Sequence, residues 1–209
     1  MISLDAARSV ARSISGNAKI LEADEARPWL DAVAAALSLV PGAGTIIALA
    51  RSTLSGAADA VAGVAIPTPW GTLILLGPRA VVDGPTYLSV VAHELVHAEQ
   101  ASAVGSAQAV IDYTQSNIRA FREAEAGGVG LWVRYLLTGH RPAPDEAGVV
   151  SSSIYHLDEE HRAFARVVVT TSLASIETAA VPAHPVAAQV LLALRAQAPD
   201  AILAREYRE

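Results

Sequence analysis

The sequence predicts an α+β fold that is predominantly helical and carries one small β-hairpin or sheet. Apolar residues recur at helical spacing in several stretches that glycine and proline separate, and one short run, Thr72–Leu76, has the composition of a strand. The chain has 209 residues, which is long enough for one compact domain with a real core. Its 52% apolar and 17% charged residues exclude a disordered chain.

The N-terminal stretch Met1–Gly16 does not have the uninterrupted apolar core of a secretory signal, because Asp5, Arg8 and Arg12 interrupt it. We therefore expect a cytoplasmic or virion-associated protein.

An apolar segment follows at Ala32–Ala50, where nineteen residues carry no charge. That length reaches the threshold for a membrane-spanning helix, but Pro41–Gly44 in its middle would break a single helix. We expect two short buried helices joined by a turn. The alternative is a helical hairpin that packs in a membrane or against a protein partner, with residues 30–66 making the contact. The next stretch, Arg51–Ala65, reads as a helix of small residues.

Pro67 and Pro69 end this N-terminal helical region and suggest a division into residues 1–66 and residues 67–209. The second unit is expected to begin with a hairpin and to continue as helices. The predicted elements are strands at Thr72–Leu76 and Arg79–Val82 around a Gly77-Pro78 turn, helices at Thr86–Ala103, Ser106–Leu137 with a soft spot at Gly127-Gly128, Asp158–Glu177 and Pro185–Ala198, and a loop at Gly139–Gly148.

His93, Glu94 and His97 form an HExxH motif inside the first of these helices. Residues four apart lie on one face of a helix, so the two imidazoles can bind one zinc ion. Glu94 lies at the same end of the site and can act as general base toward a water that the metal activates. The plain alternatives are a helix that happens to carry two histidines, or a zinc site without catalysis.

A catalytic zinc normally has three protein ligands and one open position. Glu123 and Glu125 lie on the next predicted helix, 26 and 28 residues after His97. Residues two apart on a helix point about 200° from each other, so both cannot be ligands. We prefer Glu125 as the third ligand, with Glu123 as the alternative.

The sequence HELVHAEQ, followed by a helix with the pattern Glu-x-Glu-Ala, resembles the gluzincin branch of zinc metallopeptidases in its minimal forms. The resemblance covers roughly Leu73–Leu137. It implies a zincin-like core, zinc bound by His93, His97 and Glu125, Glu94 as the base, and a peptide or protein as substrate. The third histidine of metzincins and the thermolysin-type Asn-Glu-x-x-Ser-Asp pattern are both missing from the chain.

Peptide hydrolysis also needs a donor for the oxyanion, commonly Tyr or His. Tyr155 is our first candidate, with the adjacent His156, and Tyr113 or Tyr135 could also serve. In zinc peptidases an edge strand before the motif helix holds the extended substrate, and the expected strand is Leu73–Leu76.

The composition of the chain argues against cysteine chemistry and nucleic-acid binding. The chain has no cysteine, which rules out a thiolate metal site or a cysteine nucleophile, and its net charge of −6 argues against a nucleic-acid partner. A second hypothesis is a zincin-like structural or attachment component of a larger assembly, such as a phage tail, with little or no catalysis. The charge-poor N-terminal third motivates it, because exposed apolar surface would need a partner.

Overall fold

A computed structural model describes residues 1–57, 62–140 and 184–208. The predicted class is confirmed, because helices predominate and surround one small mixed sheet. The sheet contains β1 (Ala18–Glu22), β2 (Gly63–Thr68) and β3 (Gly71–Leu76) in the order β1-β3-β2. The central strand β3 pairs in parallel with β1 and antiparallel with β2.

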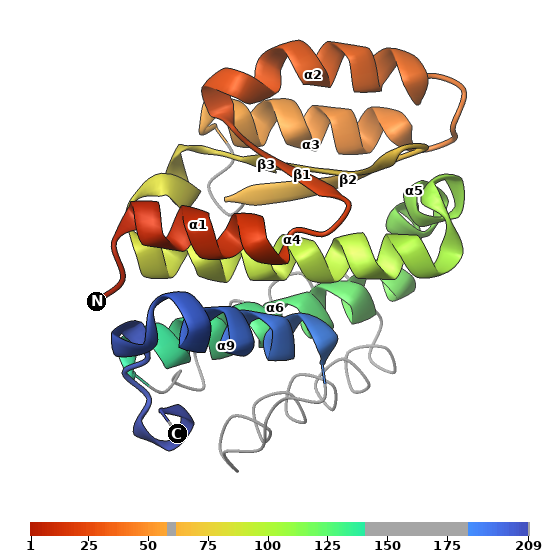
Figure 1. Cartoon of the computed structure of the whole chain (residues 1–209). Helices are drawn as coiled ribbons and strands as arrows, with labels where there is room; N and C mark the ends of the chain where they lie inside the picture. The colour runs from red at the N-terminus through yellow and green to blue at the C-terminus, as the bar shows by residue number, and fades with distance from the viewer. Residues whose placement is uncertain (58–61, 141–183, 209) are drawn as a thin grey trace.

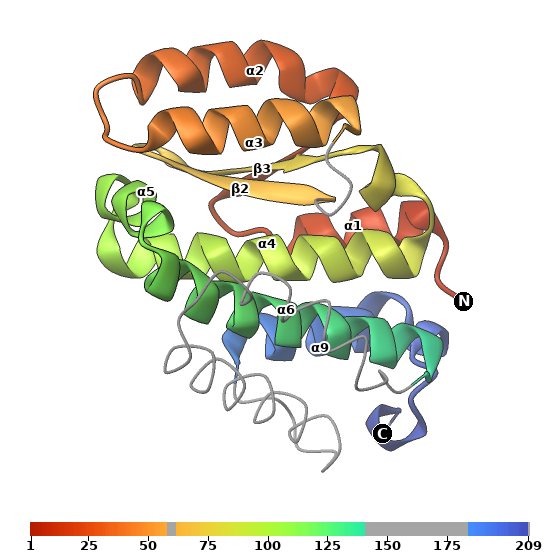
Figure 2. The ribbon, with the colours of Figure 1, turned by 180° about the vertical axis from the view of Figure 1, so that it is seen from behind.

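Helices cover both faces of the sheet (Figure 1). On one face lie α2 (Ala23–Ala36) and α3 (Ala43–Ser55), and on the other lie α1 (Leu4–Ile14) and α4 (Gly84–Val104). The view from behind shows α4 between the sheet and a further layer of helices, which contains α6 (Ser116–Thr138) and α9 (Pro185–Gln197), while α5 (Ser106–Thr114) closes one end (Figure 2).

The central strand β3 divides the core because successive side chains of a strand point to opposite faces. Leu73 and Leu75 pack into the cluster that α2 and α3 cover, whereas Ile74 and Leu76 pack into the larger cluster around α4. All four side chains are buried. A strand buried on both faces holds α4 at a fixed distance from the sheet.

Helix α4 carries the HExxH motif and is defined at both ends. The Asp83 carboxylate accepts a hydrogen bond from the Thr86 backbone N–H at 2.7 Å, and Pro85 occupies the first turn. The helix therefore begins at Gly84, two residues before the predicted Thr86, with Asp83 as its cap. The helix ends at Val104, one residue after the predicted end, because Gly105 has a φ of 88°.

The predicted pairing of strand Thr72–Leu76 with a strand at Arg79–Val82 is wrong. The segment Arg79–Val82 falls in and beside a 3₁₀ helix, η1 (Pro78–Val81), and the antiparallel partner of β3 is β2. β2 begins within Arg51–Ala65, which the sequence predicts as helix, and the division between residues 66 and 67 falls inside this strand. The turn between the two strands is made by Pro69 and Trp70, and beside it the Thr68 hydroxyl donates to the Gly71 carbonyl at 2.6 Å.

The apolar segment Ala32–Ala50 forms two helices joined by a turn, which confirms the first of the two expectations. It contains the end of α2 and most of α3, and Val33, Ile46 and Ile47 are buried against the sheet. No helix in the described ranges is both long enough and apolar enough to cross a membrane.

The predicted helix Ser106–Leu137 is interrupted at Gln115, between α5 and α6, and not at Gly127-Gly128. The helix Pro185–Ala198 is confirmed as α9. The helix Asp158–Glu177 and most of the loop Gly139–Gly148 lie outside the described residues.

Candidate metal centre

Helix α4 places His93 and His97 one turn apart, and α6 brings Glu123 to them. The two Nε2 atoms lie 3.2 Å apart. The Glu123 Oε2 atom lies 3.4 Å from Nε2 of His93 and 3.6 Å from Nε2 of His97. These three residues form the one group in the described part of the chain that could hold a metal ion.

The triangle of donor atoms has the size that a tetrahedral metal site requires. A divalent ion with bonds of about 2.0–2.2 Å in tetrahedral geometry holds its ligand atoms about 3.3–3.6 Å apart. The measured separations of 3.2, 3.4 and 3.6 Å match this spacing. The residues present therefore fit a metal with three protein ligands.

Close packing of α6 on α4 sets this geometry. The Ser89 hydroxyl donates to the Gly130 carbonyl at 2.8 Å. A Cβ on Gly130 would lie 3.2 Å from the Ser89 carbonyl oxygen and 3.5 Å from Cβ of His93. A larger residue would push α6 away, so this glycine lets the carboxylate of Glu123 reach the histidines.

Glu94 lies between α4 and the sheet, with 5% of its surface exposed. Burial raises the pKa of its carboxyl group, which the nearby histidines and a hydrogen bond from the backbone of Ala65 partly oppose. A Cβ on Gly63 would lie 3.0 Å from Oε1 of Glu94. Strand β2 therefore fixes the Glu94 side chain in two ways. Ala65 hydrogen-bonds its carboxylate, and Gly63 packs against it.

The histidines and Glu123 stabilise one another's charges in the metal-free protein. Burial alone would lower the pKa of His97, but the hydrogen bond and charge of Glu123 outweigh it and raise the pKa of His97 to about 9. Burial would raise the pKa of Glu123, yet the hydrogen bonds from His93 and His97 hold it well below its usual range. A bound metal would replace a proton on this cluster.

The metal group opens into a cavity of about 540 Å³. One wall is apolar and comes from α3 and β2, with Ile46, Leu49 and Val64. The other wall comes from α5 and α6 and includes Tyr113 and Arg119, whose guanidinium lies 5.7 Å from the ring of Tyr113. Burial, followed by the charge of Glu123, raises the pKa of Tyr113 to about 12, so its hydroxyl remains a hydrogen-bond donor at neutral pH.

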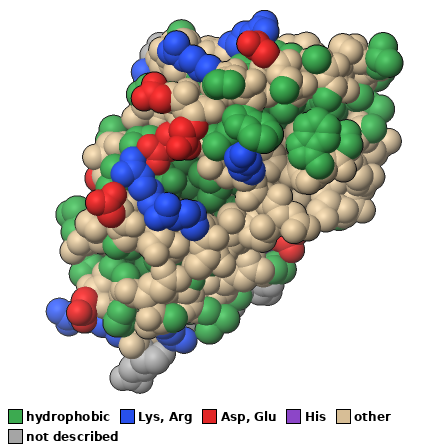
Figure 3. All heavy atoms as spheres, turned by 45° about the horizontal axis from the view of Figure 1, so that its top comes forward, with side chains coloured by type: hydrophobic (Ala, Val, Ile, Leu, Met, Phe, Trp, Pro, Cys, Tyr) green, Lys and Arg blue, Asp and Glu red, His purple; other side chains and the backbone are tan. Residues whose placement is uncertain are grey.

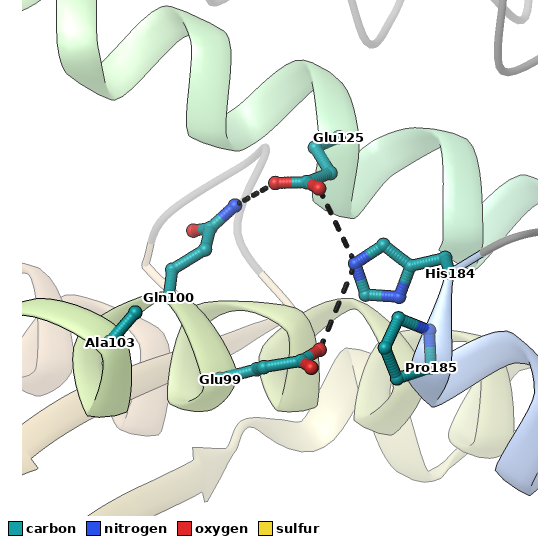
Figure 4. A pocket seen from close by; sticks show the side chains of 6 residues that line it. All are labelled: Glu99, Gln100, Ala103, Glu125, His184 and Pro185. Carbon is teal, nitrogen blue, oxygen red and sulfur yellow. Dashed lines mark hydrogen bonds and ion pairs between the residues drawn. The ribbon is translucent and has the colours of Figure 1, made fainter.

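Glu125, the third ligand that the sequence favours, does not join the histidines. Its two oxygens contact the Gln100 amide at 2.7 Å and Nε2 of His184 at 3.5 Å (Figure 4). The structure instead brings the alternative, Glu123, to the motif. The two residues point to different sides of α6, and only the packing of α6 on α4 decides which side faces the histidines.

Residues that sequence reasoning missed support the metal group. Gln100 contacts Nδ1 of His97 at 2.9 Å. The sequence could have indicated this contact, because residues three apart are neighbours on a helix surface. His184 caps α9, where its Nδ1 accepts from the Val186 backbone N–H at 3.3 Å. Asp112 lies beside this group and pairs with Arg122 at 2.5 Å.

The candidate oxyanion donors divide into three groups. Tyr155, the first choice, and the adjacent His156 lie outside the described residues. Tyr135 is buried elsewhere, with its hydroxyl on Glu206. Tyr113 lines the cavity of the metal group.

Comparison of the chain with protein-family models, with curated proteins and with solved structures found no match.

Proposed function

We propose that the protein is a zinc-dependent peptidase. The observation that supports this proposal is the triangle of His93, His97 and Glu123, whose 3.2–3.6 Å separations suit a zinc ion, with the buried carboxylate of Glu94 on the same helix. Two His of an HExxH motif and one Glu leave a fourth position open, which distinguishes catalytic from structural zinc sites.

When bound, zinc would polarise the scissile carbonyl and lower the pKa of a water toward 7. Glu94 takes the proton of the attacking water and passes it to the leaving amine. Burial raises its pKa, which makes the carboxylate a better proton acceptor than an exposed glutamate. The Ala65 N–H keeps the carboxylate oriented through both steps.

The strand that would hold the substrate is β2 and not the predicted Leu73–Leu76. Those residues belong to β3, which is paired on both sides, whereas β2 is an outer strand and lines the cavity. Because the Gly77 N–H donates to the Ala62 carbonyl, the N–H and C=O of Ala65 point away from β3, to the edge that no other described strand covers. The Ala65 N–H bonds Glu94, which leaves its carbonyl for a substrate. An extended peptide can pair there.

Tyr113 is the oxyanion donor that we propose among the described residues. It lines the cavity from α5, and its hydroxyl stays protonated at neutral pH. A donor fixed where negative charge develops contributes about 2.7–4 kcal/mol to transition-state stabilisation. The Tyr113→Phe variant therefore should lose about 100-fold in kcat and keep its zinc affinity.

Metal analysis with a hydrolysis assay tests the function. The purified protein should hold one zinc per chain and cleave a library of quenched fluorescent peptides. A chelator should stop the cleavage and added zinc should restore it. Glu94→Gln should keep zinc and lose at least about 100-fold in rate, because general-base catalysis contributes about 10²–10⁴-fold. Full activity of Glu94→Gln, or no zinc binding by the wild type, would refute the proposal.

An assembly or attachment role is the second candidate, and one observation favours it. Leu39 is 94% exposed, Trp70 62% and Trp29 38%. Figure 3, in which the α2 side comes forward, shows hydrophobic side chains in separate groups on that face. The discriminating measurement is light scattering of the full chain. Association that Leu39→Glu abolishes, in a protein that binds zinc without hydrolysis, would favour the assembly role over the peptidase.

A further inference from the structure

A series of polar contacts, two hydrogen bonds and one ion pair, connects the metal group to the N-cap of α9. It runs from Nδ1 of His97 to Gln100, from Gln100 to Glu125, and from Glu125 to His184. Figure 4 shows Gln100 on α4 and Glu125 on α6 pointing toward each other, with His184 beside Glu125. None of the last three residues belongs to the metal triangle.

The surroundings of Gln100 fix the orientation of its amide. Its nitrogen donates to Oε2 of Glu125 at 2.7 Å and to the Arg122 carbonyl at 3.2 Å. Both partners are acceptors only, so a flipped amide would place oxygen against oxygen at both contacts. The amide oxygen must therefore face Nδ1 of His97, which it meets at 2.9 Å.

The orientation of His184, the last residue in this series of contacts, is also fixed by its neighbours. Nδ1 of His184 accepts a hydrogen bond from the Val186 backbone, so the ring proton of neutral His184 lies on Nε2. That N–H points to Oε1 of Glu125 at 3.5 Å and to Oε2 of Glu99 at 3.9 Å. Glu125 is thus held by a donor on each of its two oxygens.

We infer that Gln100, held in place by Glu125 and His184, is a positioning residue that keeps the proton of His97 on Nδ1 and leaves Nε2 free for the metal. The amide oxygen is an acceptor and cannot pair with an unprotonated Nδ1. This inference rests on the proposed metal site. It assigns Glu125 a role that a metal ligand does not have, since it acts through Gln100.

Partners of this kind orient metal-bound imidazoles, and their loss typically lowers metal affinity 10–100-fold. We therefore expect Gln100→Ala to raise the zinc dissociation constant by that factor. The matched control is Gln108→Ala. Gln108 is also a helical glutamine that bonds a carboxylate, Asp112 at 2.6 Å, but it contacts no member of the metal triangle. Its removal should change the dissociation constant by less than twofold.

The double variant Gln100→Glu/Glu125→Gln exchanges donor and acceptor across the same contact. A carboxylate at position 100 still accepts from Nδ1 of His97, and an amide at position 125 still has a nitrogen to donate and an oxygen for His184. The hydrogen bond from position 100 to the Arg122 carbonyl is the one contact that the exchange does not restore. This variant should bind zinc within about threefold of the wild type. Gln100→Met keeps a side chain of similar length but offers no oxygen to Nδ1 of His97, and it should weaken zinc binding as Gln100→Ala does. Packing alone would not explain a loss in Gln100→Met together with near wild-type binding in the double variant.

A second measurement does not need metal. Nitrogen NMR of the metal-free protein reports which ring nitrogen of His97 carries the proton. The wild-type and variant residues at positions 100 and 125 are compared in a Glu123→Ala background, because the Glu123 carboxylate, 3.6 Å from Nε2, otherwise competes for the proton. The spectra are recorded at pH 10, above the pKa of about 9 that His97 has with Glu123 present, so that the ring is neutral. The wild type and the double variant should show the proton on Nδ1, and Gln100→Ala should show a mixture of both tautomers. Circular dichroism shows that each variant is folded.

The outcomes separate the inference from the proposed function. A proton on Nε2 in the wild type, or an unchanged tautomer in Gln100→Ala, overturns the role of Gln100. A wild type that binds no zinc overturns the peptidase proposal, while the tautomer measurement still decides the role of Gln100. Zinc binding that weakens as expected in Gln100→Ala, in a protein that hydrolyses no peptide, supports the role of Gln100 and rejects the peptidase.

Discussion

Gly63 is the position where strand β2 comes closest to Glu94, and Gly63→Ala tests that contact. The new methyl group would lie 2.8 Å from Cγ1 of Val90 and 3.0 Å from both Cγ and Oε1 of Glu94. Carbon atoms in contact prefer about 3.5–4.0 Å, so the neighbours must move by roughly 0.5–1 Å. Val90 is β-branched and has little rotamer freedom in a helix, which makes the shift costly.

The expected loss follows from two opposing effects. Overpacking a core position destabilises the protein by about 1–3 kcal/mol. Replacing glycine by alanine stabilises it by about 0.4–1 kcal/mol, because the unfolded chain then has fewer conformations to lose. Gly63 has no positive φ, so backbone strain adds nothing. We expect the free energy of unfolding to fall by about 0.5–2 kcal/mol. If hydrolysis occurs as proposed, kcat should fall at least about 10-fold because Glu94 is displaced, with the zinc dissociation constant unchanged.

Urea denaturation measures the change, and Gly44→Ala is its control. Gly44 lies in the first turn of α3, is exposed, and an added Cβ there would meet no atom within 4 Å. The same substitution should therefore raise the stability there by up to about 1 kcal/mol. If Gly63→Ala gains stability as Gly44→Ala does, the close packing of β2 on Glu94 is refuted.

The other predictions concern the metal and a buried ion pair. Zinc at 100 times its dissociation constant should raise the free energy of unfolding by about 2.7 kcal/mol, and Glu123→Ala should abolish this shift in a thermal melt. Glu125→Ala should keep the shift once zinc is increased to match its weaker binding, whereas loss at every concentration would make Glu125 a ligand. Arg122→Met should cost about 3–5 kcal/mol because the Asp112 carboxylate, 8% exposed, would remain buried without its charged partner. Arg51→Met, whose ion pair is 63% and 83% exposed, should change stability by less than about 1 kcal/mol, and equal costs would refute the difference.

Local features of the site could be predicted because they depend on near neighbours in sequence. The spacing of His93 and His97 by four residues places both on one face of any helix. The helix itself follows from an aspartate cap, a proline in its first turn and a glycine at its end. No tertiary contact is needed for these conclusions.

Features that depend on distant neighbours could not be predicted in this way. Strand β1 pairs with β3 across more than forty intervening residues, and its five residues AKILE carry no alternation that marks a strand. Gly63, the first residue of β2, belongs to a run of small residues whose composition resembles a helix, yet a glycine is needed where the strand approaches Glu94. The predicted hairpin failed because the pairing partner of β3 precedes it in the chain.

The choice between Glu123 and Glu125 shows the same limit at the site. Both lie on α6 near the motif helix, and sequence establishes only that they point in different directions. The contact at Gly130, where α6 approaches Ser89 and His93, decides that Glu123 faces the metal group. The two-residue spacing then directs Glu125 to the other side, where it meets Gln100 and His184. The two glutamates are therefore not rival ligands. One rotation of α6 about its axis fixes both the third donor of the triangle and the hydrogen bond behind His97, so a disturbance of the α4–α6 packing would disturb both together.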